Sequence, residues 1–104
     1  MEKTIMLCCA AGMSTSMLVA KMEDAAKADG IEAKIFACPA SEADEKIAQE
    51  NVSVVLLGPQ VSYLLSSFKE KLADKNIPVE VINMQAYGMM DGEKVLHQGL
   101  DLAK

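Results

Sequence analysis

The sequence has no tryptophan and no arginine, and its aromatic residues are two tyrosines and two phenylalanines. All ten basic residues are therefore lysines, and the formal net charge is −5. A nucleic-acid-binding surface needs clustered positive charge, which this chain lacks, so we expect no nucleic-acid partner. No apolar run approaches the roughly 18 residues of a membrane-spanning helix, and the first residues do not resemble an export signal. We expect a soluble, cytoplasmic protein.

Cysteine is scarce and unevenly placed. The three cysteines are Cys8, Cys9 and Cys38, an odd number with two of them adjacent, so the set does not predict a disulfide framework. Hydrophobic residues make up 51% of the 104 residues, which suffices for one buried core. We predict a single domain spanning residues 1–104, and we expect neither a cofactor nor a bound metal.

Apolar runs alternate with segments of helical periodicity. Residues 4–9 and 52–57 are nearly continuous apolar runs, typical of central parallel strands covered on both faces. Residues 31–37 and 79–82 alternate and predict edge strands. Residues 41–51 give a weaker helix pattern that starts at a serine. Three other helices are predicted by apolar side chains at helical spacing: Leu18, Met22 and Ala25; Val61, Leu64, Leu65, Phe68 and Leu72; and Leu96, Leu100 and Ala103.

This order of elements predicts an α/β fold. Right-handed crossovers with the first and third strands inside give an open four-stranded parallel sheet in the order 2-1-3-4, flavodoxin-like, with helices on both faces. In such a sheet, ligands bind at the carboxyl ends of the strands, beside the point where the winding reverses. That point follows the first strand, where the chain reads LCCAAGMSTSML from residue 7 to residue 18.

This stretch joins a cysteine to small and hydroxylated residues. Backbone N–H groups of a tight loop and the positive end of a helix favour a bound anion, and a helix N-terminus also favours the reactive thiolate. We predict that Cys9 is a nucleophile open to solvent at the edge of a phosphate-sized site, whereas Cys8 is a core residue of the strand. The predicted phosphate-binding residues are Ala10, Ala11, Gly12, Met13, Ser14, Thr15 and Ser16.

Two kinds of phosphoryl chemistry use a cysteine in such a loop. Low-molecular-weight phosphatases and the related arsenate reductases carry C-x-x-x-x-x-R, which would place an arginine at Thr15. The chain also has no Asp or Glu between Thr4 and Met22 to act as a general acid. The lack of an arginine and of a general acid suits a phosphoryl carrier, because a phosphocysteine must persist until its acceptor arrives. The phosphatase remains the alternative, and a flavin- or nucleotide-binding module is disfavoured by the few aromatic residues.

Residues 9–16, CAAGMSTS, resemble the C-x-x-G-M-S-T-S loop of the EIIB components of the bacterial phosphoenolpyruvate-dependent sugar phosphotransferase system, in the lactose/cellobiose/chitobiose class. Residues 54–60 (VVLLGPQ) with Tyr63, and residues 87–92 (YGMMDG), extend the resemblance over nearly the whole chain. It implies that a phosphohistidine of EIIA donates to Cys9. Phospho-Cys9 then donates to a β-linked disaccharide in the membrane permease EIIC. Because EIIC mainly chooses the sugar, cellobiose, chitobiose and lactose are not distinguished by this sequence.

Further residues are predicted near the same end of the sheet. Gly58, Pro59 and Gln60 follow the third strand, so the Gln60 amide either orients a phosphoryl oxygen or partner, or is simply solvated. Tyr87 either assists partner docking or anchors its long connection. Flexible methionines suit a surface that meets two partners in turn. They are Met13, Met17, Met89 and Met90.

Two remaining residues carry chemistry that the main prediction does not use. His97 lies in the last predicted helix and is interpreted as an ordinary surface residue. Cys38 ends the second strand, next to the first strand, so it approaches Cys9 in this topology. A reversible Cys9–Cys38 disulfide is therefore a hypothesis.

Overall fold

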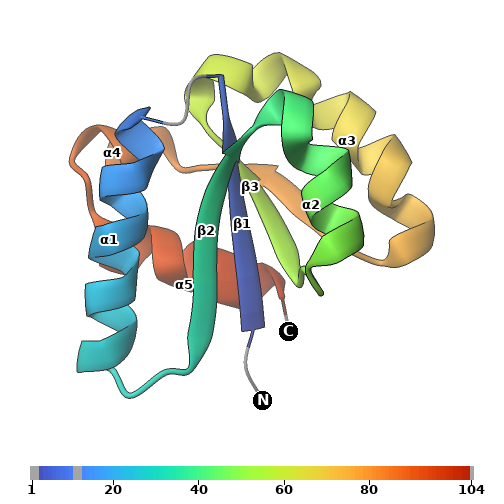
Figure 1. The fold of residues 1–104 in the computed structure, drawn as a ribbon. Coiled ribbons are helices and arrows are strands. Elements are labelled where there is room, and N and C mark those ends of the chain that lie inside the picture. Colours follow the sequence, from blue (N-terminus) through green and yellow to red (C-terminus); the bar gives the residue numbers. More distant parts are fainter. Residues whose placement is uncertain (1–2, 11–12, 104) are drawn as a thin grey trace.

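A computed structural model of the chain describes residues 3–10 and 13–103, with Met13 and Ser14 described by their backbone only. Four parallel strands form one sheet in the order β2-β1-β3-β4, which confirms the predicted topology (Figure 1). The strands are β1 (Lys3–Cys9), β2 (Ala33–Pro39), β3 (Val54–Leu57) and β4 (Val79–Val81). The two nearly continuous apolar runs thus form the inner strands, and the alternating ones form the edges.

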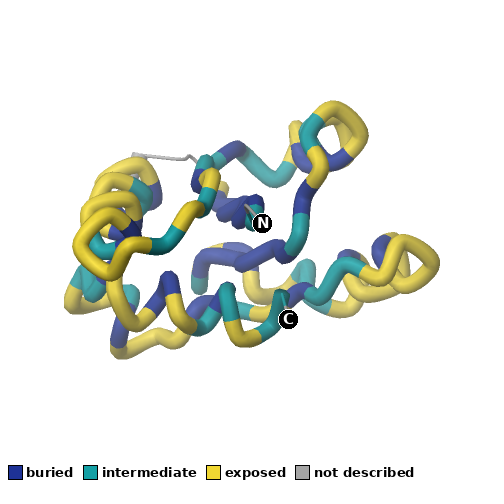
Figure 2. The backbone as a smooth tube through the Cα atoms, turned by 90° about the horizontal axis from the view of Figure 1, so that it is seen from below, coloured by how far each residue is buried: buried dark blue, intermediate teal, exposed yellow. Residues whose placement is uncertain are grey.

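Helices cover both faces of this sheet. Helices α1 (Met13–Ala28), α4 (Met84–Gly88) and α5 (Gly92–Leu102) lie on one face, and α2 (Ala43–Gln49) and α3 (Leu65–Leu72) lie on the other. Three short 3₁₀ helices, η1 (Ala40–Glu42), η2 (Pro59–Leu64) and η3 (Ala73–Lys75), flank α2 and α3. Figure 2 shows the buried residues along the sheet and the inner helix faces, with exposed residues on the outside.

Strand β1 contributes to both halves of the core. Ile5 and Leu7 pack toward α1 and α5, whereas Met6 and Cys8 pack toward α2 and α3. All four are fully buried, as expected for a central strand whose successive side chains point to opposite faces. This alternation decides which cysteine faces which helices.

The second strand begins later than predicted, at Ala33 instead of Ile31. The Ile31 N–H donates to the Ala26 carbonyl at 2.8 Å, and Gly30 adopts a positive φ of 67°. These features close the carboxyl end of α1, because a left-handed glycine lets the next N–H reach back to the last helical turn. Ile31 therefore belongs to the helix end, even though its side chain packs on the core.

A short helix lies inside the connection that the sequence suggested was irregular. Helix α4 begins after Asn83, whose side chain accepts a hydrogen bond from the Ala86 N–H at 2.9 Å. Helix α5 begins after Asp91, whose side chain accepts from the Lys94 N–H at 3.1 Å. Both are N-caps, and they place α4 at the carboxyl ends of the strands. Among the described residues, no helix has the length and apolar character needed to cross a membrane.

Candidate functional site

Cys9 is the last residue of β1, at the carboxyl end of the sheet. In the register with β2 it lies opposite Pro39, and only three residues separate it from the first residue of α1. The central strand is thus followed directly along the chain by a long helix, and both ends lie on the same side of the sheet (Figure 1). This is the order of strand and helix that the sequence predicted.

Thr15 lies in the first turn of α1 and contacts this cysteine. Its Oγ1 atom is 3.0 Å from Cys9 Sγ, and its side chain is fully buried. Either atom can be the donor: the thiol can donate to the hydroxyl oxygen, or the hydroxyl can donate to the sulfur. Thr15 thus occupies the position where a phosphatase loop carries its arginine, and here it supplies a hydroxyl to the sulfur.

The expectation of a thiol open to solvent is wrong for this structure. Cys9 is only 3% exposed. The physical reason is its position at the end of a central strand, with β2 on one side, β3 on the other and Thr15 against its sulfur. Little of Cys9 therefore contacts solvent in this structure, too little for a phosphoryl group carried by another protein to reach it directly.

The loop residues fall partly outside the described structure. Ala11 and Gly12 lie outside it, as do the side chains of Met13 and Ser14. Ala10 is exposed, and Ser16 lies exposed on α1. The predicted convergence of amide groups on the sulfur therefore stays a prediction. It is favoured by general helix geometry, because the first N–H groups of α1 have no acceptor within the helix.

The turn after β3 lies beside Cys9, as predicted. The Gly58 N–H donates to the Cys8 carbonyl at 2.7 Å, and a methyl group placed on Gly58 would lie 3.6 Å from Cys9 Cβ. Pro59 then starts η2. The side-chain amide of Gln60 donates to the Tyr87 hydroxyl at 3.1 Å. The structure thus joins two residues that sequence reasoning singled out separately, and it links the turn after β3 to α4.

Cys8 and Cys38 form a second thiol cluster on the other face of the sheet. They lie opposite each other in the β1–β2 register, and both pack in the core under α2 and α3. Cys9 points to the α1 face, where it contacts Thr15. The predicted approach of Cys38 to Cys9 is therefore wrong, because the two side chains lie on opposite faces.

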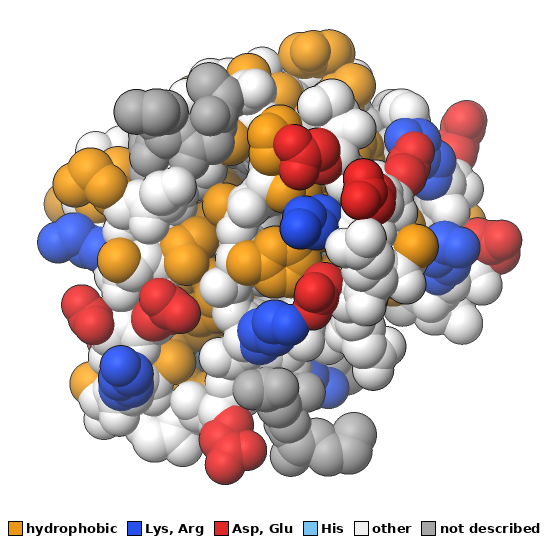
Figure 3. Space-filling view, viewed as in Figure 1, with side chains coloured by type: hydrophobic (Ala, Val, Ile, Leu, Met, Phe, Trp, Pro, Cys, Tyr) orange, Lys and Arg blue, Asp and Glu red, His pale blue; other side chains and the backbone are white. Residues whose placement is uncertain are grey.

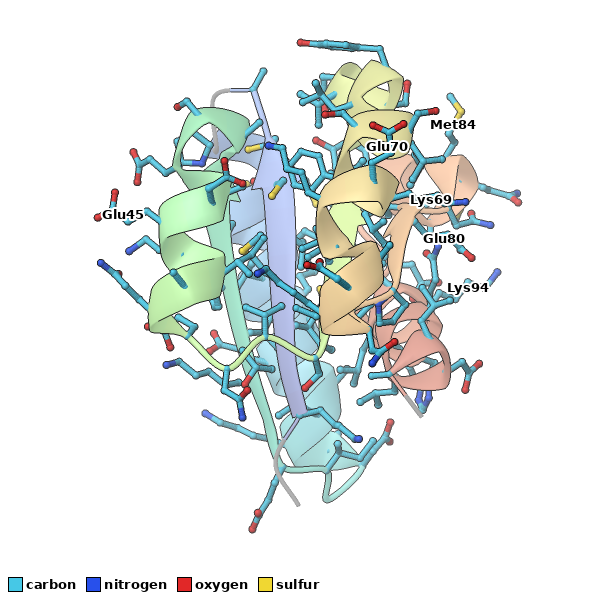
Figure 4. The ribbon with its side chains drawn as sticks, turned by 90° about the vertical axis from the view of Figure 1, so that its right-hand side faces the viewer. Glu45, Lys69, Glu70, Glu80, Met84 and Lys94 are labelled. Atoms are coloured by element: carbon cyan, nitrogen blue, oxygen red, sulfur yellow. The ribbon has the colours of Figure 1, made fainter. Side chains whose placement is uncertain are left out.

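Large apolar side chains are exposed around the same end of the sheet. They are Met17 at 61%, Tyr63 at 77%, Met84 at 72% and Met89 at 70%. Met84 points away from the sheet at the α4 end (Figure 4), and apolar side chains reach the surface along the upper edge of the view in Figure 3. By contrast His97 is exposed on α5, with Nε2 at 3.3 Å from Asp29 Oδ2, as an ordinary surface residue would be.

Comparison with known proteins decides the family. The sequence profile described as "PTS system, Lactose/Cellobiose specific IIB subunit" matches residues 4–98. The chain belongs to this family. IIB subunits are components of the sugar phosphotransferase system, so the resemblance stated from the CAAGMSTS loop is confirmed.

Individual members of the family differ in the sugar that they are named for. The chain is 46% identical over 100 residues to the oligo-beta-mannoside-specific EIIB component of Bacillus subtilis strain 168, covering 96% of this chain and 95% of that one. It is 45% identical over 98 residues to the galactose-specific EIIB component of Lactococcus lactis subsp. cremoris strain MG1363, covering 91% of each. The solution structure of the cellobiose-specific IIB component of Borrelia burgdorferi superposes with a TM-score of 0.79 at 40% identity, covering 98% and 92%.

Proposed function

We propose that this chain carries a phosphoryl group on Cys9, from a phosphohistidine of an EIIA protein to a sugar bound by an EIIC permease. The observation that carries the proposal is the position of Cys9 Sγ, at the carboxyl end of the central strand and 3.0 Å from Thr15 Oγ1. Family membership supports the phosphotransferase role. In this proposal residues 1–104 work as one domain in the cytoplasm.

The relay consists of two displacements at phosphorus. In the first, the Cys9 sulfur attacks the phosphohistidine, an S–P bond forms, the N–P bond breaks, and the thiol proton passes to the freed imidazole nitrogen. In the second, a sugar hydroxyl attacks, an O–P bond forms, the S–P bond breaks, and the hydroxyl proton passes to the freed sulfur. Such steps need mainly alignment and charge stabilisation. We assign these tasks to the backbone N–H groups of residues 10–16 and to the Thr15 hydroxyl, without a cofactor.

The absence of arginine favours a carrier over a phosphatase. A guanidinium binds two phosphoryl oxygens at once, and this chain has none. The sequence around Cys9 also lacks a carboxyl group that would protonate a leaving alcohol. Hydrolysis of phospho-Cys9 is therefore slow in this proposal, and the phosphoryl group waits for its acceptor.

Burial of Cys9 makes the transfer depend on the donor. A sulfur in a residue that is 3% exposed offers no free path for in-line attack. We infer that docking of the donor displaces the cover of Cys9. The exposed Met17, Met84 and Met89 around this end of the sheet supply an adaptable apolar surface for docking. We assign to Gln60, which donates to the Tyr87 hydroxyl, the role of orienting the partner or a phosphoryl oxygen.

The relatives support a sugar phosphotransferase role but do not identify one sugar. Proteins named for oligo-beta-mannoside and for galactose match this chain equally well, at 46% and 45% identity. We propose a β-linked disaccharide of the cellobiose, chitobiose or lactose type, selected mainly by the permease. Phosphorylation of a panel of such sugars, with matching EIIC in membrane vesicles, identifies the substrate.

The direct test is phosphoryl transfer from radiolabelled phospho-EIIA to the wild-type protein and to variants in which one cysteine at a time is replaced. We expect wild type, Cys8→Ala and Cys38→Ala to acquire label, and Cys9→Ser to acquire no thiol-type phosphoryl group. Label on the Cys9→Ser protein at wild-type level contradicts the assignment. Rapid hydrolysis of p-nitrophenyl phosphate by the isolated protein would instead favour the phosphatase alternative.

A further inference from the structure

The relay leaves two buried thiols without a role. Cys8 of β1 lies directly opposite Cys38 of β2, and both are free thiols. Both are buried in the apolar core between the sheet and helices α2 and α3. The two thiols are therefore a facing pair across β1 and β2, and Cys8 directly precedes the candidate nucleophile Cys9 in the chain.

The backbone geometry allows this pair to be crosslinked. Neighbouring strands lie about 4.8 Å apart, and disulfides form across Cα separations of about 4.4–6.8 Å. Opposite residues of parallel strands also point to the same face. Cys9 has neither advantage, because its partner in the register is Pro39 and its sulfur contacts Thr15 on the other face.

The two thiols differ in acidity. The neighbouring Cys38 side chain, together with burial, raises the pKa of Cys8 above its ordinary range. The neighbouring Cys8 side chain lowers the pKa of Cys38. We therefore assign the first attack on the oxidant to Cys38, because the thiolate is the form that small oxidants attack. Cys8 is in place to resolve the oxidised product.

We propose that Cys8 and Cys38 are a site of reversible oxidation to a disulfide by a small peroxide, and that Cys9 stays reduced. The Cys38 sulfur attacks hydrogen peroxide, the O–O bond breaks, and Cys38 becomes a sulfenic acid with release of one water. The Cys8 sulfur then attacks the Cys38 sulfur, the S–O bond breaks, and a second water leaves. Two thiols and one peroxide thus give one disulfide and two waters, and a dithiol reductant reverses the change.

The test maps the crosslink by mass. Cys8 and Cys9 share the tryptic peptide 4–21, whereas Cys38 lies in peptide 35–46, so variants must separate them. After peroxide treatment and blocking of free thiols, we expect the linked peptides in wild type and in Cys9→Ser at equal yield. We expect no link in Cys8→Ala or in Cys38→Ala, and loss of the link with dithiothreitol.

Three results overturn the proposal. They are a link that persists in Cys8→Ala, which would make Cys9 the partner; a link that disappears in Cys9→Ser; and no intramolecular link in wild type. Far-UV circular dichroism of each variant, and of wild type after oxidation, establishes that the crosslink forms in folded protein. None of these readouts uses phosphoryl transfer, so failure here is distinct from failure of the proposed relay.

Discussion

The contact between Thr15 and Cys9 predicts different consequences for two similar substitutions. Among the described residues, the buried polar side chains are Thr4 and Thr15. Valine keeps the shape of threonine and removes its hydroxyl, so Thr15→Val deletes the contact of 3.0 Å with Cys9 Sγ. Thr4→Val makes the same chemical change on β1, roughly 16 Å from Cys9 for five residues of extended strand. Thr4→Val is therefore the matched control.

The magnitudes separate a stability effect from a transfer effect. Loss of a neutral hydrogen bond costs about 0.5–1.5 kcal/mol of folding stability, which lowers the melting temperature by about 4–8 °C per kcal/mol in a domain of this size. Thr15→Val is expected to show this loss, because its hydroxyl contacts Cys9 Sγ. A hydrogen bond to a charged sulfur contributes about 1.5–3 kcal/mol. If the Thr15 hydroxyl stabilises the sulfur during transfer, Thr15→Val slows phosphorylation about 10- to 150-fold.

The assay is the rate of label transfer from phospho-EIIA, measured beside thermal unfolding. The chain has no tryptophan, so unfolding is followed by circular dichroism. We expect Thr4→Val to transfer at the wild-type rate and Thr15→Val to be slow at a temperature where both are folded. The reasoning is refuted if Thr15→Val transfers at the wild-type rate, or if Thr4→Val is slowed to the same extent.

Two other contacts give quantitative predictions. A methyl group on Gly92 would lie 2.5 Å from the backbone carbon of Lys21, so Gly92→Ala should lower the free energy of unfolding by about 1–3 kcal/mol in urea. A methyl group on Gly88 would have no atom within 4 Å, so Gly88→Ala should not destabilise the protein and serves as the control. Equal stability of the two variants would disprove the close packing of α1 and α5. Gln98 accepts from the Asn83 N–H at 2.9 Å and donates to the carbonyl of residue 81 at 3.0 Å, so Gln98→Leu should cost about 1–2 kcal/mol. An unchanged urea midpoint for Gln98→Leu would show that these two hydrogen bonds at the end of β4 contribute nothing to folding stability.

The strand order was predictable because two different apolar patterns distinguish inner from edge strands. Residues 5–9 and 54–57 are buried apolar side chains that point to both faces of the sheet, and only the inner strands of a covered sheet require this pattern. The connections were harder to predict. The last helix, which Asp91 caps, was predicted from its apolar spacing, but the five-residue helix that Asn83 caps is too short for a helical period to stand out. The residue type of Asn83 was the available signal, since Asn is a favoured N-cap.

The partner of Cys38 was not predictable without the register. The sequence places Cys38 on the strand next to β1, but a shift of one residue moves its side chain to the other face. The observed start of β2 at Ala33 sets Cys38 opposite Cys8 instead of Cys9. That start depends on Gly30 and Ile31 closing α1, a local feature that alternating hydrophobicity does not report.

The burial of Cys9 has the same origin as its proposed selectivity. A nucleophile at the end of an inner strand is flanked by two neighbouring strands, so the position that brings Thr15 of α1 against the sulfur also covers it. A free phosphate ester gains too little binding energy to displace that cover, whereas a protein partner gains it over a whole interface. In the proposed relay the covered sulfur therefore discriminates against small phosphate esters as donors, and the missing arginine slows hydrolysis of phospho-Cys9.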